Sequence, residues 1–375
     1  MDRLIDEIVK VRVSDAATSA TAAQVNTVAI VGIPTRTGTA TTIQYSQDGV
    51  RTAYDDGYDS APKTADKSGL SKTSEAFFLE SNPGRLVCIP VTAEPTGDDI
   101  GGTLDDALEG GNDFYHVIVR SDSKDKETVV ALVGALQDWC DTNFRLAHLE
   151  LTDRATASSA LAELANDAAK TFDRVAVYFH SETNGRSLAA ALVANRCASD
   201  PARGTWALKS LSSVSADSFT LANFKDAQTK SMNIYAVAGG VANTFWGSTG
   251  AQSDTADGET APTHFIDERI KKDWLKFRTQ EKIFDLLRQA NNGDGLDYDD
   301  AGIAGVEAAI TNLFSEAADN EHRYVLDGSV EVSVPKFDDI DEKNRKIRNL
   351  PKVNVQFSIL ASIHTVKTVE LQVLA

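Results

Sequence analysis

The sequence predicts a mixed α/β (α+β overall) protein with two domains: an α/β domain with a largely parallel sheet over residues 27–262 and an α+β domain over residues 263–365. Three observations predict it. Strand and helix patterns alternate between residues 114 and 237, as in a parallel sheet covered by helices. Two long amphipathic helical patterns follow residue 263. Alternating strands stand at both ends, so we also expect extended β-arms: an N-terminal arm with its linker over 1–26 and a C-terminal arm over 366–375.

Charge and composition exclude several classes of protein. The 375 residues carry 37 Lys and Arg against 55 Asp and Glu, a net charge of −18 that repels nucleic acid and anionic membranes. The sequence contains no run of 18 apolar residues and begins with an acidic segment, so we expect neither a membrane-spanning helix nor a secretory signal, and a chain that stays in a cytoplasm until it is released. Cys88, Cys140 and Cys197 form no CxxC pair, which predicts buried thiols rather than disulfides or zinc ligands. We expect no cofactor and no metal.

Both ends of the chain are predicted to contact other copies. Apolar residues alternate with polar ones near each terminus, and residues 14–23 form a linker of small residues that can extend over ~33–36 Å. That reach is enough to pair with a neighbouring molecule. The candidate contacts between subunits are Val9, Val11, Val13, Val369, Leu371 and Val373.

The first domain is predicted from its order of elements. Strands are expected over 27–34, 85–89, 114–119, 146–151 and 174–179, with a further strand over 231–237 that closes the unit. A helix is expected to end at 75–79, and others around 129–139, 161–168 and 188–198, whereas most of the chain before residue 110 is polar and without a clear pattern.

The second domain begins with a helix predicted over 264–290 that has a cationic face. Its apolar stripe runs through Ile266, Ile270, Trp274 and Phe277, and at about 100° per residue its basic side chains lie ~80° or more from that stripe. This cationic face is interpreted either as a contact surface for an acidic partner or as an ordinary solvated face. A second helix uses Ile303 to Ala317, and strands are expected over 329–335 and 353–359.

Motifs for ligand binding are incomplete. The stretch from Gly32 to Gly38 has one residue too many between its glycines and lacks the Lys-Ser/Thr pair of a phosphate loop. The acidic stretch 294–302 lacks the glutamate that a calcium loop requires, so we interpret it as a helix N-terminus capped by Asp299 or Asp300.

No catalytic constellation stands out, so the sequence does not indicate an enzyme. His116, His148 and His180 lie in or at the end of consecutive predicted strands, so they could neighbour each other in a sheet. Buried, hydrogen-bonded histidines are favoured there over ligands. An α/β enzyme stays open as an alternative because ligands bind at the carboxyl ends of parallel strands, although no glycine-rich turn follows them. The polar residues at those ends are Arg120-Ser121-Asp122, Thr152-Asp153 and His180-Ser181-Glu182.

Several motifs follow one another in the last third of the chain. They are Trp274-Leu275, the segments 283–287, 296–303 and 310–313, and the run from Asn344 to Val355. In this order they resemble the conserved C-terminal domain of bacteriophage contractile tail sheath proteins. The run from Asn344 to Val355 matches the family pattern Arg-x-x-Arg-x-x-Pro before a strand. The strand ends at Ala361-Ser362-Ile363-His364, where the family has Gly-Ala-Ile-His.

The resemblance implies a mechanical role. Sheath subunits form stacked hexameric rings around a tail tube, with the C-terminal domain inside and the other domain outside, and their arms add strands to neighbouring subunits. Contraction then drives the tube through the host envelope during genome delivery. The implied location is the virion tail, assembled in the host cytoplasm, with tail tube, baseplate and tail terminator proteins as partners. The residues implied to face an acidic tube are Arg269, Lys272, Lys276 and Arg278.

Two structural alternatives belong to the same class. One is the sheath of a phage-like secretion or bacteriocin particle, and the other is a tube or baseplate protein. The α/β enzyme that uses residues 114–237 is the more distant alternative.

Overall fold

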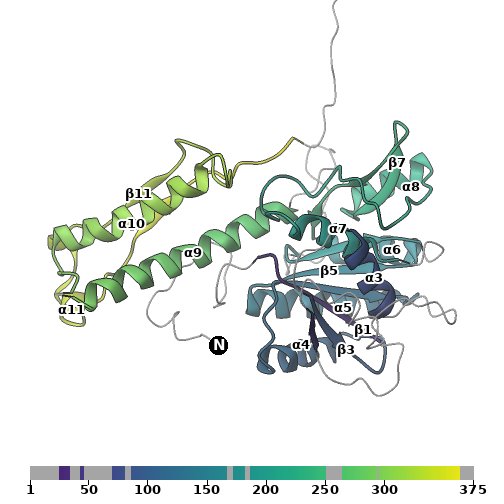
Figure 1. Ribbon diagram of the computed structural model, residues 1–375, viewed down its shortest axis with the longest axis horizontal. Coiled ribbons are helices and arrows are strands. Elements are labelled where there is room, and N and C mark those ends of the chain that lie inside the picture. Colours follow the sequence, from purple (N-terminus) through teal and green to yellow (C-terminus); the bar gives the residue numbers. More distant parts are fainter. Residues whose placement is uncertain are drawn as a thin grey trace, which may run out of the picture. The chain divides into compact units, whose positions relative to one another are not determined.

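The computed structural model describes residues 25–33, 43–45, 70–80, 86–166, 172–181, 186–250, 264–293 and 295–363. They form two compact units, one of residues 25–140 and 145–269 and the other of residues 141–144 and 270–360 (Figure 1). The predicted C-terminal arm and residues 1–24 of the predicted N-terminal arm lie outside the described residues, together with all six candidate contact residues and with residues 34–42 after the first strand.

The larger unit is built on a six-stranded sheet, which confirms the predicted α/β class. Five strands are parallel, in the order β3 (Leu86–Pro90), β1 (Val28–Gly32), β4 (His116–Ser121), β5 (Leu146–Leu151) and β6 (Val175–Phe179). The short β2 (Ile43–Tyr45) pairs antiparallel with β3 at the edge. The β1, β3, β4, β5 and β6 side chains are almost all buried, as expected for a sheet covered on both faces.

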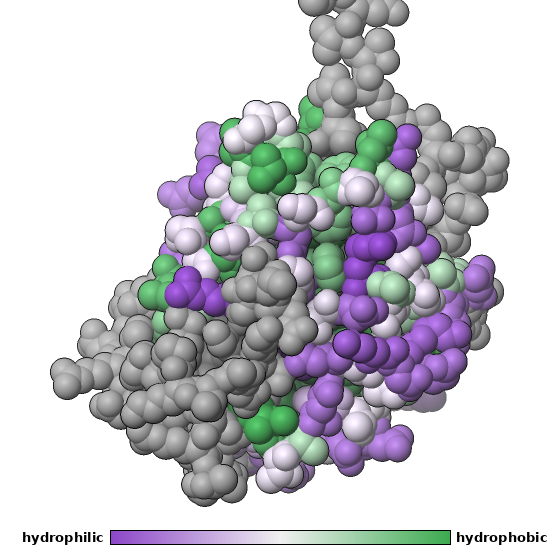
Figure 2. All heavy atoms as spheres, turned by 90° about the vertical axis from the view of Figure 1, so that its right-hand side faces the viewer, coloured by the Kyte–Doolittle hydropathy of each residue, from purple (hydrophilic) through white to green (hydrophobic). Residues whose placement is uncertain are grey.

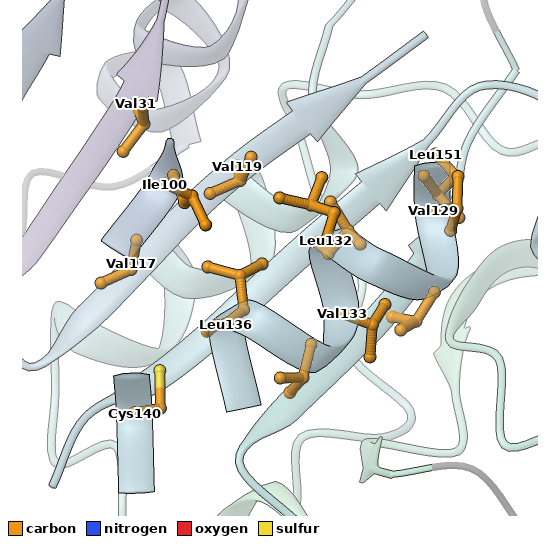
Figure 3. Close-up of a cluster of buried hydrophobic side chains, with 14 of the residues drawn as sticks. Val31, Ile100, Val117, Val119, Val129, Leu132, Val133, Leu136, Cys140 and Leu151 are labelled. Carbon is orange, nitrogen blue, oxygen red and sulfur yellow. The ribbon is translucent and has the colours of Figure 1, made fainter. Parts of the chain in front are cut away.

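Helices cover both faces of this sheet. The core on one face includes apolar residues of α4 (Ile100–Glu109), α5 (Lys126–Asn143) and α6 (Arg154–Ala165). Figure 3 shows Leu132 and Leu136 of α5 beside Val117 and Val119 of β4. On the other face, α3 (Leu70–Glu80) packs with α7 (Leu188–Cys197), and these helices contact β1 and β5. All three cysteines are buried free thiols, as predicted.

Two elements of this unit differ from the sequence prediction. Helix α4 was not predicted, because Gly101 and Gly102 weaken its helical pattern, yet Ile100, Leu104 and Ala107 bury one face of it. The expected closing strand is instead β7 (Ile234–Ala238), which pairs antiparallel with β8 (Val241–Phe245) and meets β6 only through a bridge from Asn233 to Tyr178. The two-residue Gly239-Gly240 turn, with φ of +60° and +82°, forces this hairpin.

The hairpin and the adjacent α8 (Leu221–Thr229) expose apolar side chains. Phe224 of α8 packs edge to face on Phe245 of β8, with ring centres 4.9 Å apart. Beyond this contact Leu221, Val237 and Val241 are 70%, 61% and 54% exposed. Figure 2 views the side of the molecule on which α8 and the hairpin lie, and hydrophobic surface gathers in its upper part. A small ladder of β9 (Ser248–Thr249) with β10 (His264–Phe265) completes the unit.

The smaller unit consists of two long helices and a strand ribbon. Helix α9 (Ile266–Asn291) contributes residues from Ile270 onward, and α10 (Asp300–Ala318) buries the predicted stripe from Ile303 to Ala317. Asp299 caps α10, since its carboxylate accepts a hydrogen bond from the Gly302 amide at 2.8 Å. The ribbon pairs β11 (Glu331–Ser333) with β12 (Asn354–Gln356), and a 3-10 turn (Phe337–Asp339) and the short α11 (Glu342–Lys346) lie between them.

Candidate functional site

The carboxyl edge of the parallel sheet is where an α/β enzyme would bind its ligand, and here a glutamate fills its central turn. The Glu94 carboxylate accepts hydrogen bonds from the amides of Asp122 and Ser123, at 2.8 and 3.1 Å, and from the Ser121 hydroxyl. These donors follow β4, beside β1, where the order of the strands reverses. Phosphate groups of nucleotides bind such donors in doubly wound folds. The chain's own carboxylate therefore occupies them.

A second carboxylate fills the N-terminus of α7. Glu150, in β5, is fully buried and accepts hydrogen bonds from the Ser187 hydroxyl at 2.9 Å and the Ala189 amide at 2.8 Å. Its other oxygen lies 3.8 Å from Nε of Arg120, which is also buried. Because the amide groups at a helix N-terminus attract negative charge, Glu150 serves this helix as a ligand anion would.

The end of β6 holds a histidine–aspartate pair. Nδ1 of His180 lies 2.7 Å from Oδ2 of Asp217, and the same carboxylate accepts a hydrogen bond from the Ser181 amide at 3.1 Å. A base and an orienting carboxylate are thus present, but no described serine, threonine or cysteine is hydrogen-bonded to Nε2 of His180. The enzyme alternative is therefore left with a base and its orienting carboxylate, but with no nucleophile hydrogen-bonded to that base among the described residues.

Three side chains form a buried hydrogen-bonded chain across the middle of the sheet. Nε2 of His116 lies 3.0 Å from the carbonyl oxygen of Val25, and Nδ1 of His116 lies 2.9 Å from Nε2 of His148. Nδ1 of His148 lies 2.9 Å from the Tyr178 hydroxyl, and Trp206 covers both imidazole rings. The predicted neighbourhood is confirmed for His116 and His148, whereas His180 bonds elsewhere.

Burial keeps both imidazoles of this chain neutral. Desolvation lowers the pKa of His116 from 6.5 to about 3 and that of His148 well below its usual value. Desolvation, followed by the nearby charge of Glu150, raises the pKa of the Tyr178 hydroxyl well above 10. These three hydrogen-bonded side chains fix the positions of their strands within a closed core and offer no group for reaction with solvent.

The predicted cationic residues of α9 do not share one solvent-exposed face. Arg269 is buried and its Nη1 lies 2.8 Å from Oδ2 of Asp173. Lys276 is also buried, and its Nζ lies 2.9 Å from the centre of the Phe144 ring. Lys272 is half-buried, and Arg278, exposed, pairs with Glu281 at 2.8 Å. The helix is covered over more of its circumference than its apolar stripe indicates, because a cation–π contact and an ion pair allow charged residues to be buried.

The ribbon of the smaller unit pairs with no third strand among the residues that the structure places. Among the described residues β11 pairs with β12 alone, through the register Glu331 to Gln356, Val332 to Val355 and Ser333 to Asn354. The two central valines are half-buried and the four polar residues are exposed. A two-stranded ribbon is marginally stable by itself, and its outer edges present unpaired backbone groups.

The described residues contain no group of three or more His, Cys, Asp or Glu placed to hold a metal ion. None of the helices that the structure describes is long and apolar enough to cross a membrane.

Solved structures that are distantly similar to this chain include a tail sheath protein. The crystal structure of the sheath tail protein Lin1278 from Listeria innocua is similar, with 10% sequence identity and a TM-score of 0.45. The similarity covers 71% of this chain and 57% of that protein, so the chain spans little more than half of its length. No family model and no curated protein sequence matches the chain.

Sequence reasoning missed the carboxylates that fill the sheet edge. Glu94 lies in a loop 27 residues before Ser121, and Asp217 lies 37 residues after His180. Neither belongs to a periodic pattern or a motif, so no signal in the sequence places them at this edge.

Proposed function

We propose that this chain is the structural subunit of a contractile tail sheath, which assembles as stacked hexameric rings around a tail tube. Two lines of support come from the chain itself. The family-like segments between Trp274 and His364 appear in order, and the ribbon of β11 and β12 pairs with no third strand in the part of the chain that the structure describes. The ribbon is the observation that carries the proposal, because it is an incomplete sheet that added strands would complete.

Strand addition supplies enough free energy to join subunits. Each main-chain hydrogen bond contributes about 0.5–1.5 kcal/mol net, and each cross-strand side-chain pair contributes about 0.2–1 kcal/mol. In the proposed assembly the valines at positions 9, 11 and 13 and the apolar residues at 369, 371 and 373 supply the added strands. Each joint is then worth several kcal/mol, and a ring repeats it.

The filled carboxyl edge of the sheet fits a mechanical role better than a catalytic one. Glu94 and Glu150 already occupy amide donors that a nucleotide phosphate would use. In the proposed mechanism the extended sheath is metastable and contraction draws on contacts between subunits, so no bound nucleotide is required.

Contact with the tube is proposed for the accessible part of α9. Arg269 and Lys276 are buried, which leaves Lys272 and Arg278 to meet an acidic tube surface. Such contacts are weak and screened by salt, so they can release during contraction.

Negative-stain electron microscopy of the purified protein tests the proposal. We expect the concentrated protein to form tubes of stacked rings without any other component. A protein that stays monomeric at high concentration, with and without tube protein, would contradict it. Neighbouring capsid and terminase genes would distinguish a phage virion from a secretion or bacteriocin particle.

A further inference from the structure

A compact turn of the smaller unit concentrates positive charge in an acidic protein. Residues 343–352 contain five Lys or Arg and no Asp or Glu, so the other 365 residues together carry −23, against −18 for the whole chain. We call this segment the basic turn. Lys343, Lys346 and Arg348 are exposed, and Ile347 between them is 63% exposed. An exposed apolar side chain surrounded by charged ones has the composition of a contact surface with a polar rim.

The basic turn is held in place by its neighbours. The Tyr298 hydroxyl donates a hydrogen bond to the carbonyl oxygen of Asn349 at 2.7 Å, and the Arg345 guanidinium lies 4.9 Å from the centre of the Phe337 ring. Arg348 has a φ of +56°, a left-handed conformation that is unfavourable for a non-glycine residue. The turn is thus a fixed feature that presents its side chains in a set geometry.

Most of the charge of the turn is not neutralised within the described residues. Lys346 pairs with Glu342 at 2.8 Å, but both side chains are about 70% exposed, and such pairs contribute little. Lys343, Arg348 and Lys352 have no ion-pair partner in the part of the chain that the structure describes. The basic turn therefore carries net positive charge that is available for contact with another molecule.

The larger unit carries a matching acidic surface on α4. Between Arg85 and Arg120 the chain has no lysine or arginine and seven acidic residues. Asp105, Asp106 and Glu109 are exposed, as is Gly102, and the spacing of these four residues places them on one face of the helix. Asp98 and Asp99 extend this acidic stripe at the helix start. A Cβ atom added to Gly102 would meet no other atom within 4 Å, so the stripe has a flat, open centre.

We propose that the basic turn of one copy binds the acidic stripe of a second copy of this chain. Complementary charge favours the contact, and Ile347 would rest on the open surface at Gly102, ringed by carboxylates. A second copy is a better partner than nucleic acid, because the remaining −23 charges of the chain repel phosphate. The inference rests on the proposed self-assembly and adds to it a contact between the two kinds of unit.

Charge reversal tests this contact. The turn variant is Lys343→Glu, Lys346→Glu, Arg348→Glu, with a net charge of about −24, and the stripe variant is Asp98→Lys, Asp106→Lys, Glu109→Lys, with about −12, since each reversal changes the charge by two. Each is expected to raise the critical concentration for polymer growth, measured by light scattering, about tenfold or more. The chain with all six substitutions has the wild-type net charge and restored complementarity, so its critical concentration should return toward that of the wild type.

A control separates the contact from overall charge. Lys124→Glu, Arg203→Glu, Lys225→Glu reverses three exposed basic residues elsewhere and also gives about −24. It should leave the critical concentration nearly unchanged. An equal effect of this control, or no recovery in the six-substitution chain with a wild-type melting temperature, would overturn the inference. The inference would also be overturned if the wild-type chain bound a short DNA duplex and the turn variant did not.

Failure of the proposed function remains distinguishable. If the wild type forms no polymer, sedimentation at low ionic strength measures weak dimers of four chains: the wild type, the turn variant, the stripe variant and the chain with all six substitutions. A dimer that is weakened about tenfold in the turn variant and in the stripe variant, and restored by all six substitutions, supports the contact without a sheath. Identical sedimentation of all four chains would reject it.

Discussion

The hydrogen-bonded chain of His116, His148 and Tyr178 has a fixed direction. The Val25 carbonyl can only accept, so Nε2 of His116 donates to it, and Nδ1 of His116 then accepts from Nε2 of His148. Nδ1 of His148 is left to accept from the Tyr178 hydroxyl. Protonation of His116 would place two donors face to face, and protonation of His148 would reverse its hydrogen bond with the Tyr178 hydroxyl and leave a charge buried, so both changes are costly.

This arrangement predicts a loss of stability in mild acid. Below about pH 6.5 the unfolded chain protonates both histidines, whereas the folded chain keeps them neutral down to about pH 3 for His116. The free energy of unfolding should therefore decrease as the pH falls, by about 1.4 kcal/mol per pH unit for each histidine. Urea unfolding between pH 6.5 and 4.5 measures this slope before the carboxylates titrate.

Matched substitutions assign the slope to these residues. His148→Gln should flatten the slope by about one histidine's share, and His116→Gln should do the same. An unchanged slope in the His148 variant would show that the acid sensitivity arises elsewhere.

At the scale of elements, the start of α10 depends on one glycine. A Cβ atom at Gly302 would lie 1.9 Å from the carbonyl oxygen of Asp297, and this glycine also supplies the amide that Asp299 caps. At Gly305, one turn along the same helix, a Cβ atom would meet only Leu296, at an ordinary 3.6 Å. The two glycines of one helix therefore have opposite constraints.

The pair gives a prediction with its own control. Gly302→Ala should destabilise the protein by about 1–3 kcal/mol, since the backbone around Asp297 must move. Gly305→Ala should be neutral or stabilising by up to about 1 kcal/mol, because alanine is the better helix former. Thermal unfolding of the two variants tests this, and equal effects would mean that the approach of Asp297 to α10 does not matter.

Most elements could be predicted from the sequence, and the exceptions have physical reasons. The buried run Leu146–Leu151 and the stripe of α10 are periodic, so β5 and α10 appear where expected. Two pairs of glycines account for the wrong predictions. Gly101-Gly102 weakened the helical pattern of α4, although the opposite face of this helix is buried. Gly239-Gly240 forms a turn that makes the expected sheet strand part of a hairpin. Local pattern does not reveal what tertiary packing or a turn imposes.

The candidate sites were less predictable than the fold. The cap at Asp299 and the contact between His116 and His148 follow from spacing, and the structure confirms both. The burial of Arg269 and Lys276 depends on Asp173 and Phe144, which lie far away in sequence. Which of several carboxylates meets a given donor is decided by long-range topology, which no single sequence displays.

At the scale of the whole molecule, the terminal arms are predicted to govern assembly. Deleting residues 1–13 should leave a folded chain that no longer polymerises, because the arm is proposed to supply a strand to a neighbour and the buried core of the described residues contains none of them. Circular dichroism should report an unchanged fold, and light scattering should show no growth. A deletion variant that polymerises like the wild type would exclude the N-terminal arm as a joint.

The carboxylates at the sheet edge have a consequence for how the protein responds to its surroundings. Glu94, Glu150 and Asp217 permanently satisfy donors that other α/β proteins leave vacant for a metabolite. Small anions therefore cannot bind to those donors. In the proposed assembly, a change of state would then come from neighbouring subunits that contact the outer surface of this unit.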